Sequence, residues 1–259
     1  MRHLVIPLIL STAVGTLPIV AQDKVIDLSK PVIESVKPDR LYWPFDDGEL
    51  GLSRPNPTAD QSGNSLNGAL QGEKTALTPD YVTGKYGTAI SIEGTPTQSP
   101  CVGWRPSSPD SPSVEKLNLG KTSFTMGAWI KLGESEPGER AHVVFFQTPA
   151  WHFALIKTGD DQWVPTLVSQ KRAKGPAILG LQDGNWHHLA MSVENDAEGT
   201  GAMITFWHDG QVLGTPQRLE ASIPPEVALR FRMTLGRSNI KGATVFDDAF
   251  ITSGVYSFK

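Results

Sequence analysis

GNWHHLAMSVE at residues 184–194 and AMITFWHDGQVLG at residues 202–214 are the two neighbouring segments that decide the fold of this chain. In the first segment, Leu189, Met191 and Val193 alternate with smaller or polar residues, and the second segment repeats the alternation with aromatic residues. A period of two without heptad spacing is typical of β-strands that bury one face. Both segments are therefore predicted to be strands.

A strong hairpin signal ends the second segment. Asp209-Gly210 lies between two alternating runs, and this dipeptide favours a type I′ turn, in which both central residues have positive φ. A polar stretch from Asn195 to Gly201 separates the two segments and predicts another turn. The sequence from residue 184 to residue 214 therefore predicts a meander of antiparallel strands.

Length and composition limit the class of protein. The 259 residues suffice for one large all-β domain or two ordinary domains. The formal net charge is -4 and no basic block is present, so nothing indicates a surface for nucleic acid. Cys101 is the only cysteine, which excludes an internal disulfide. The fold must therefore rest on its core and, in one interpretation, on a metal ion.

The N-terminus has the features of a secretory signal peptide. Arg2 and His3 precede an uncharged run that ends in the small residue Ala21. Cleavage there predicts a secreted or periplasmic protein without membrane insertion; a membrane anchor is the alternative. The chain is thus divided into a signal peptide at 1–21, a polar leader or linker at 22–38 and one folded domain at 39–259.

Several motifs occur in the order found in a known family. LYWPFDDG at residues 41–48 is followed by DQSGNSLNG at residues 60–68. FDDAFI at residues 246–251 follows the two segments quoted above, 184–194 and 202–214. Together these motifs resemble the laminin-G-like (LamG-like) jelly-roll domains of the concanavalin A-like lectin/glucanase group, over about Leu41 to Tyr256. The resemblance implies an all-β fold, a two-sheet antiparallel β-sandwich. Relatives usually add a short polar tail, so the sequence is consistent with a piece of a longer protein.

The resemblance also implies a metal site. Similar sandwiches hold a structural Ca²⁺ where the first and last strands meet, with oxygen ligands from carboxylates, amides and exposed carbonyls. The residues of this chain at those positions are Asp60, Asn64, Asp248, Asp46 and Asp247. The alternative is that these side chains only shape turns.

Zinc chemistry and glycoside hydrolysis find little support in the sequence. His187 and His188 are adjacent on a predicted strand, so their side chains leave from opposite faces and cannot share one Zn²⁺. No strand carries the pair of carboxylates that related glucanases use for a retaining mechanism. We therefore expect no catalytic residues, and the chain is not predicted to be an enzyme.

Tryptophans are the candidate ligand-binding residues. Trp129 and Trp207 fall on strand faces opposite the predicted core and, with His188, would form a platform on which sugar rings stack. Trp104 and Trp151 lie in segments predicted to be irregular, and would form a loop site at one rim. The alternative for the strand residues is packing, because a large sheet can be covered on both faces.

The sequence thus favours an exported, non-catalytic module that recognises carbohydrate or a glycosylated surface. The ligand class comes from the resemblance, since the fold alone does not fix function. One alternative is a structural or protein–protein interaction module of a larger secreted protein. A second is a carbohydrate-active hydrolase with an unrecognised site.

Overall fold

The computed structural model describes most of the predicted domain and the segment before it. The described residues are 24–48, 50, 58–71, 80–92, 101–104, 115–117, 119–135, 141–148, 150–221, 223, 231–235, 240–241 and 243–259. The predicted signal peptide at 1–21 lies outside them. Among the helices of the described part, none has the length and apolar character needed to cross a bilayer.

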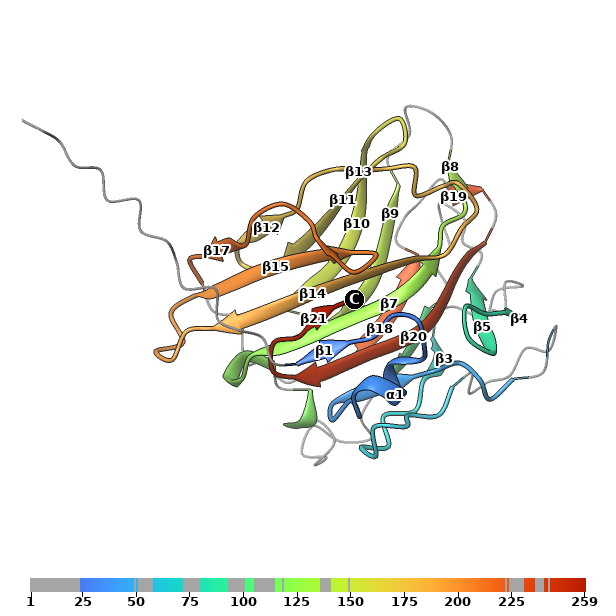
Figure 1. Ribbon diagram of the computed structural model, residues 1–259, viewed down its shortest axis with the longest axis horizontal. Coiled ribbons are helices and arrows are strands. Elements are labelled where there is room, and N and C mark those ends of the chain that lie inside the picture. Colours follow the sequence, from blue (N-terminus) through green and yellow to red (C-terminus); the bar gives the residue numbers. More distant parts are fainter. Residues whose placement is uncertain are drawn as a thin grey trace, which may run out of the picture.

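One of the two main sheets, called the front sheet here, lies toward the viewer in Figure 1. Its path is β16 (Gln211–Val212), β15 (Ala202–His208), β14 (His187–Asn195), β7 (Phe124–Lys131), β20 (Thr244–Ser253), β5 (Thr88–Ile92) and β4 (Asp80–Thr83). Two strands lie off this path: β17 (Gln217–Leu219) pairs with β15, and β2 (Leu41–Trp43) pairs with β20. All these pairings are antiparallel.

The second main sheet, called the back sheet here, lies behind the first (Figure 1). Its path is β12 (Arg172–Lys174), β11 (Gln162–Val168), β10 (His152–Gly159), β9 (His142–Gln147), β18 (Phe231–Leu235), β6 (Cys101–Trp104) and β3 (Ala69–Gln71), and β13 (Ile178–Leu179) pairs with β11. The remaining elements are short: β1 (Val25–Ile26), α1 (Val32–Ser35), η1 (Leu119–Lys121), β8 (Glu134–Ser135), β19 (Ile240–Lys241) and β21 (Ser257–Phe258).

The two sheets pack face to face around one hydrophobic core. Phe246 of β20 lies against Phe145 of β9, with ring centroids 5.9 Å apart, and Phe153 of β10 stacks on Phe206 of β15 at 6.2 Å. Such contacts between inner faces define a β-sandwich. The predicted all-β, two-sheet antiparallel fold is therefore confirmed.

The segments at residues 184–194 and 202–214 form the meander that their alternation predicts. β14 pairs with β15 and with β7 in register from end to end. Leu189, Met191 and Val193 point into the core between the sheets. The turn after β15 has φ of 46° at Asp209 and 81° at Gly210, as the predicted hairpin requires.

The outer face of the front sheet is also buried, and both ends of the described chain cover it. Residues 24–36 and 256–259 lie over β14, β7 and β20 (Figure 1) and form a second cluster of buried apolar residues with them. Its members are Ile26, Leu28, Val32, Tyr42, Trp129, Ala190, Trp207, Phe250, Tyr256 and Phe258. Residues 24–36 are therefore part of the domain, and the prediction of a leader or linker up to residue 38 is wrong.

Backbone hydrogen bonds join the two covering segments. β1 and β21 form a parallel pair. Leu28 N donates to Lys259 O at 2.8 Å, and Lys259 N donates to Ile26 O at 3.1 Å. A two-stranded ribbon is only marginally stable by itself in water, so its apolar underside must supply most of its stability.

Residues 24–36 and 256–259, which cover the outer face of the front sheet, are called the covering layer here. Their packing gives a stability prediction. Phe258 is 6% exposed and its ring lies 5.3 Å from Trp207 and 4.9 Å from His188. We expect Phe258→Ala to lower the free energy of unfolding by about 3 kcal/mol, because it removes a buried aromatic ring and leaves a cavity. Urea unfolding measures the loss, and acrylamide quenching should show more accessible tryptophan.

The matched control is Leu179→Ala on the back sheet, where the side chain is 67% exposed. This substitution removes an apolar side chain that covers nothing, so the unfolding midpoint should stay within experimental error. Equal effects of the two variants would show that the ribbon does not seal the sheet.

Candidate functional site

The structure buries the predicted tryptophan platform. Trp129 and Trp207 do lie on the face opposite the core, but they are only 5% and 6% exposed. Phe258 lies over Trp207, and Tyr86 packs edge-on against Trp129 at 6.2 Å. A sugar ring cannot stack on an indole whose faces are already in contact, so the prediction of an exposed platform is wrong.

His188 belongs to the same buried layer. It is 0% exposed and lies between aromatic rings, stacked on Phe250 at 6.3 Å and tilted against Phe258 at 4.9 Å. Burial lowers the pKa of His188 to about 3, so the ring is neutral at physiological pH. His188 therefore packs the front sheet and does not reach a ligand.

Trp104 and Trp151 do not form a loop site either. Trp104 lies in strand β6 and is 7% exposed, and Trp151 precedes β10 and is 3% exposed. Both are members of the core cluster between the sheets, where Trp151 stacks on Phe124 at 6.4 Å. The four predicted tryptophans are thus packing residues in two different layers.

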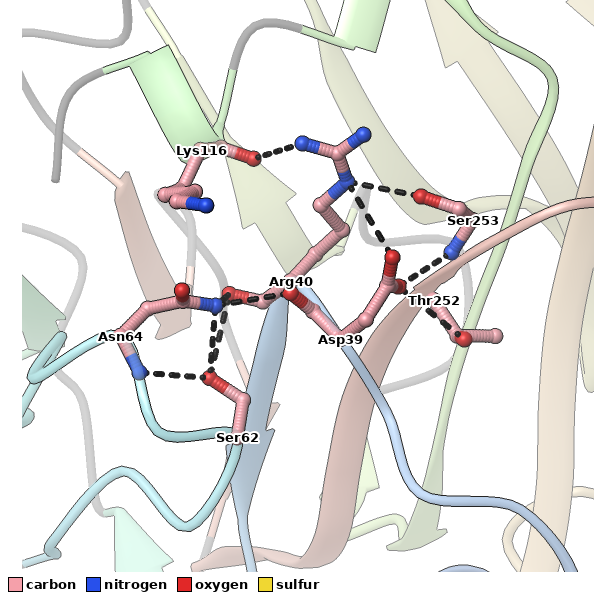
Figure 2. Close-up of polar contacts among 7 residues, drawn as sticks. All are labelled: Asp39, Arg40, Ser62, Asn64, Lys116, Thr252 and Ser253. Carbon is pink, nitrogen blue, oxygen red and sulfur yellow. Dashed lines mark hydrogen bonds and ion pairs between the residues drawn. The ribbon is translucent and has the colours of Figure 1, made fainter. Parts of the chain in front are cut away.

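Two of the five predicted calcium ligands hold a turn together. Both oxygens of Asp60 accept two hydrogen bonds: Oδ1 from the Tyr42 and Ser62 amides, and Oδ2 from Leu66 N and Ser62 Oγ. These four bonds use the acceptor sites of a carboxylate. Asn64 points its amide nitrogen at the carbonyls of Asp39 and Arg40 (Figure 2), at 2.8 and 3.1 Å.

The Asn64 loop is tied in turn to the last strand. Asp39 Oδ1 accepts from Ser253 N at 2.7 Å, and Arg40 Nε donates to Ser253 Oγ at 2.8 Å (Figure 2). These contacts fasten the segment directly before β2 to β20. Asp60 does not fit a Ca²⁺ site, because both of its oxygens are already occupied by hydrogen bonds within the turn. Asn64 uses its amide nitrogen to hold the backbone before β2.

A β-bulge in β20 positions Asp247 and Asp248, two more of the predicted calcium ligands. The register of β20 against β7 shifts between Asp247 and Phe250, and Asp248 has a positive φ of 50°. Because of the extra residue, Phe246 and Ala249 both face the core, while Asp247 and Asp248 both point away from it. Two consecutive carboxylates therefore share the outer face of one strand.

Asp248 secures the helix of the covering layer. Its carboxylate is 1% exposed, accepts a hydrogen bond from the Tyr42 hydroxyl and accepts Val32 N of α1 at 2.8 Å. A carboxylate at the first turn of a helix satisfies amides that lack partners within the helix. These two hydrogen bonds account for the burial of the Asp248 carboxylate.

Asp247 and Asp46 retain the features of a cation site. Asp247 is 1% exposed, and its Oδ1 is buried without a hydrogen-bond partner. Its Oδ2 accepts Tyr86 N at 2.9 Å, while Asp46 Oδ1 accepts Thr88 N at 2.9 Å, so both carboxylates hold the turn between β4 and β5. Gly87 (φ 61°) is required there, because a Cβ would lie 2.2 Å from Asp46 Oδ1.

The electrostatics of this corner disfavour charge. Burial raises the pKa of Asp247 to about 8, and the neighbouring Asp248 and Asp46 carboxylates act in the same direction. Burial also raises the pKa of Asp248 to about 6, against the hydrogen bonds from Tyr42 and Val32. The buried, unpartnered Oδ1 of Asp247 and its raised pKa fit a site that a hard cation would neutralise. Of the five predicted ligands, Asp247 and Asp46 remain the candidates for a calcium site.

The raised pKa of Asp247 gives a prediction for the metal-free protein. Between pH 4 and pH 8 the unfolded chain releases this proton while the folded chain retains it, so the free energy of unfolding should fall as pH rises. Below pH 4 both states bind the proton and the contribution is constant. Urea unfolding in chelator should show that Asp247→Asn removes this part of the pH dependence. An unchanged profile would contradict the raised pKa.

A groove at one end of the sandwich is the open candidate for ligand binding. It has a volume of about 470 Å³ and lies where β8, the β10–β11 turn and the loop before β14 meet. It is lined by Glu134, Ser135, Lys157, Asp160, Asp161, Gly180, Gln182 and Asp183. None of these residues was among the predicted site residues.

Hydrogen bonds between the loops organise the groove. Gly180 N donates to Asp161 Oδ2 at 2.9 Å, and Ser135 Oγ donates to Gln182 Oε1 at 2.9 Å. Hydrogen bonds from the backbone and side chain of Asn185 lower the pKa of Asp183 to about 2. The groove therefore presents carboxylate oxygens on loops that are fixed to one another by hydrogen bonds.

Comparison with protein families identifies the class. The family model for the concanavalin A-like lectin/glucanases superfamily, of laminin-G type, matches residues 108–252, more than half of the chain. The chain therefore belongs to this superfamily. No curated protein sequence matches the chain.

Solved structures support the fold assignment. The chain is similar to domain 4 of AbnA, an extracellular arabinanase from Geobacillus stearothermophilus, with a TM-score of 0.54 and 18% identity over 82% of this chain and 93% of that one. A carbohydrate esterase of bacteriophage phi24B matches with a TM-score of 0.52 and 14% identity over 84% and 99% of the two chains.

The binding domain of botulinum neurotoxin serotype D also matches, with a TM-score of 0.52 and 11% identity over 84% of this chain. The chain spans about half the length of that domain, 48%. At these identities the similarity shows the fold.

Proposed function

We propose that this protein is an exported, non-catalytic binding module that recognises carbohydrate or a glycosylated surface. The proposed binding site is the groove at one end of the sandwich, called the rim groove from here on. The observation that carries the proposal is the groove itself: an open cavity lined mainly by polar and charged residues, on loops that are fixed by hydrogen bonds. The buried tryptophans leave the strand faces without an exposed aromatic platform among the predicted residues. Recognition is therefore assigned to the rim.

The lining of the groove suits sugar hydroxyls. Carboxylates accept hydrogen bonds from them, while the Gln182 and Ser135 side chains bond to each other and hold the loops in place. The four carboxylates outnumber the one lysine in the lining, so the groove carries net negative charge. We expect neutral or amino sugars to bind in preference to uronic or sialic acids, whose carboxylates would be repelled.

The acid–base properties favour binding over hydrolysis. Glycoside hydrolysis needs a carboxylic acid with a raised pKa that touches the substrate. In the described part of the chain the carboxyls with raised pKa are Asp46, Asp247 and Asp248, and the last two are only 1% exposed. The Asp183 carboxyl in the groove is shifted the other way.

The structural similarities support the same proposal. The AbnA domain was solved in complex with arabinotriose, and the neurotoxin match is a binding domain. The phage protein is an esterase, which keeps a hydrolase as the alternative. A protein–protein interaction module of a larger secreted protein is the other alternative.

A glycan array tests the function. We expect neutral glycans to bind, and the double variant Glu134→Gln/Asp161→Asn to bind about thirtyfold more weakly, because each substitution replaces a hydrogen bond to a charged group by one to a neutral group, a loss of about 1 kcal/mol each. Both substitutions keep the size of the side chains. The control is Glu198→Gln. Glu198 is exposed in the turn between β14 and β15, at the end of β14 that lies away from the groove. If the wild-type protein is folded but binds no glycan on the array, carbohydrate recognition is contradicted and the protein is assigned as a protein–protein interaction module.

We also propose that calcium binds at Asp247 and Asp46 and stabilises the fold. Calcium at a hundred times its dissociation constant should raise the melting temperature by about 5–10 °C. Asp247→Asn should abolish this increase, and Asp80→Asn on the exposed side of β4 should preserve it. An equal calcium response in both variants would refute this site.

A further inference from the structure

Two histidines and an aspartate meet where β14 begins and β15 ends. Leu189 of β14 pairs with His208 of β15, so His187 lies diagonally beside His208. Asp209 follows His208 directly in the hairpin turn. We call His187, His208 and Asp209 the imidazole–aspartate cluster. Their ligand atoms all lie within 4.8 Å of one another.

The distances within the cluster are short and nearly equal. His187 Nδ1 lies 2.8 Å from Asp209 Oδ2 and 3.2 Å from His208 Nε2. His208 Nε2 lies 3.1 Å from the same Asp209 oxygen. The three atoms therefore form a compact triangle.

This triangle is close to one face of a tetrahedral zinc site. With Zn–N and Zn–O distances of about 2.0–2.2 Å, two ligand atoms in a tetrahedron lie about 3.3–3.6 Å apart. The observed separations are a few tenths of an ångström smaller. A cation would need only a slight widening of the triangle, which partly exposed side chains can provide.

The three atoms can act together as electron-pair donors. His187 Nδ1 and His208 Nε2 lie 3.2 Å apart, and both face Asp209 Oδ2. A neutral imidazole carries a lone pair on one ring nitrogen, and a carboxylate oxygen carries lone pairs as well. A metal ion between the three atoms would accept one lone pair from each of them.

The surroundings orient the cluster as metal sites require. His187 Nε2, the nitrogen turned away from the triangle, lies 3.2 Å from Asp183 Oδ1. A carboxylate on the far nitrogen of a ligating histidine fixes the ring and its tautomer. Asp209 is fixed as well, because its Oδ1 accepts His188 N at 2.7 Å.

We propose that the imidazole–aspartate cluster binds a divalent transition-metal ion of the Zn²⁺ type. His187 Nδ1, His208 Nε2 and Asp209 Oδ2 are the ligands, and Asp183 positions His187. Imidazole donors suit Zn²⁺ and its neighbours in the first transition row better than Ca²⁺ or Mg²⁺. Three protein ligands leave a fourth position for water or for an oxygen of a bound molecule.

The histidine that lies beside His187 is therefore not its sequence neighbour His188. His187 and His188 do leave from opposite faces, and His188 is buried in the covering layer. The partner of His187 comes instead from the next strand, 21 residues later, where no local spacing reveals it. The proposal stands independently of carbohydrate recognition.

The test is calorimetric titration of tag-free, metal-depleted protein with ZnCl₂. We expect one Zn²⁺ per chain for the wild type, undiminished by excess CaCl₂. His208→Gln should abolish measurable binding. Asp183→Asn should weaken it by about 10–100-fold, as for other residues that orient a metal ligand. With Co²⁺ in place of Zn²⁺, the wild type should show the visible absorption of a tetrahedral ion.

The matched control is His152→Gln, which removes a histidine that also lies beside another histidine, His142, with ring centroids 5.9 Å apart. This variant should bind Zn²⁺ like the wild type. Circular dichroism checks that each variant is folded, and His187→Gln replaces His208→Gln if the latter is not. Wild type without stoichiometric zinc, or folded His208→Gln with unchanged affinity, would overturn the proposal.

Discussion

The burial of the outer face of the front sheet beneath the two chain ends is the constraint on which the rest of the structure depends. One face of this sheet packs against the back sheet, and the other packs against β1, α1 and β21. An antiparallel sheet commonly leaves one face to solvent, where an aromatic platform could lie. Here that face is a second core, and for this reason we assign the proposed recognition to the loops at the rims.

The covering layer also determines the electrostatics of the acidic corner. Tyr42 and Val32, both members of the second cluster, donate hydrogen bonds to Asp248. The same burial excludes water from Asp247 and leaves one of its oxygens without a partner. Two of the five non-glycine residues with positive φ in the described part of the chain lie here, Phe45 (φ 62°) and Asp248 (φ 50°), and both are buried. Backbone strain of this kind persists where the surroundings enforce it, often at functional sites.

The sequence predicted the strands and their faces well, because side-chain alternation is local. It placed Trp129 and Trp207 on the correct face but could not show that this face is covered. The cover depends on residues 24–36 and 256–259, which pair across more than 200 residues and contain only a few apolar side chains each. The bulge at Asp248 was also invisible, since one extra residue reverses the faces of a strand without changing its composition.

The candidate sites were harder to predict for a similar reason. In the sequence, Asp209 is fully explained as a turn residue, so nothing there indicated its contacts with two histidines. The groove combines single residues from three separate loops, such as Glu134, Asp161 and Asp183. Asp and Gly in these loops signal turns, and turn chemistry alone does not tell which loops meet.

Hydrogen–deuterium exchange of the terminal ribbon tests the central claim most directly. Ser257 N donates to Lys24 O, and Lys259 N donates to Ile26 O, each at 3.1 Å. If the two chain ends seal the sheet, these amides should exchange orders of magnitude more slowly than those of an unstructured chain. Exchange at the unstructured rate, with β7 still protected, would show that the outer face is open and would contradict the account.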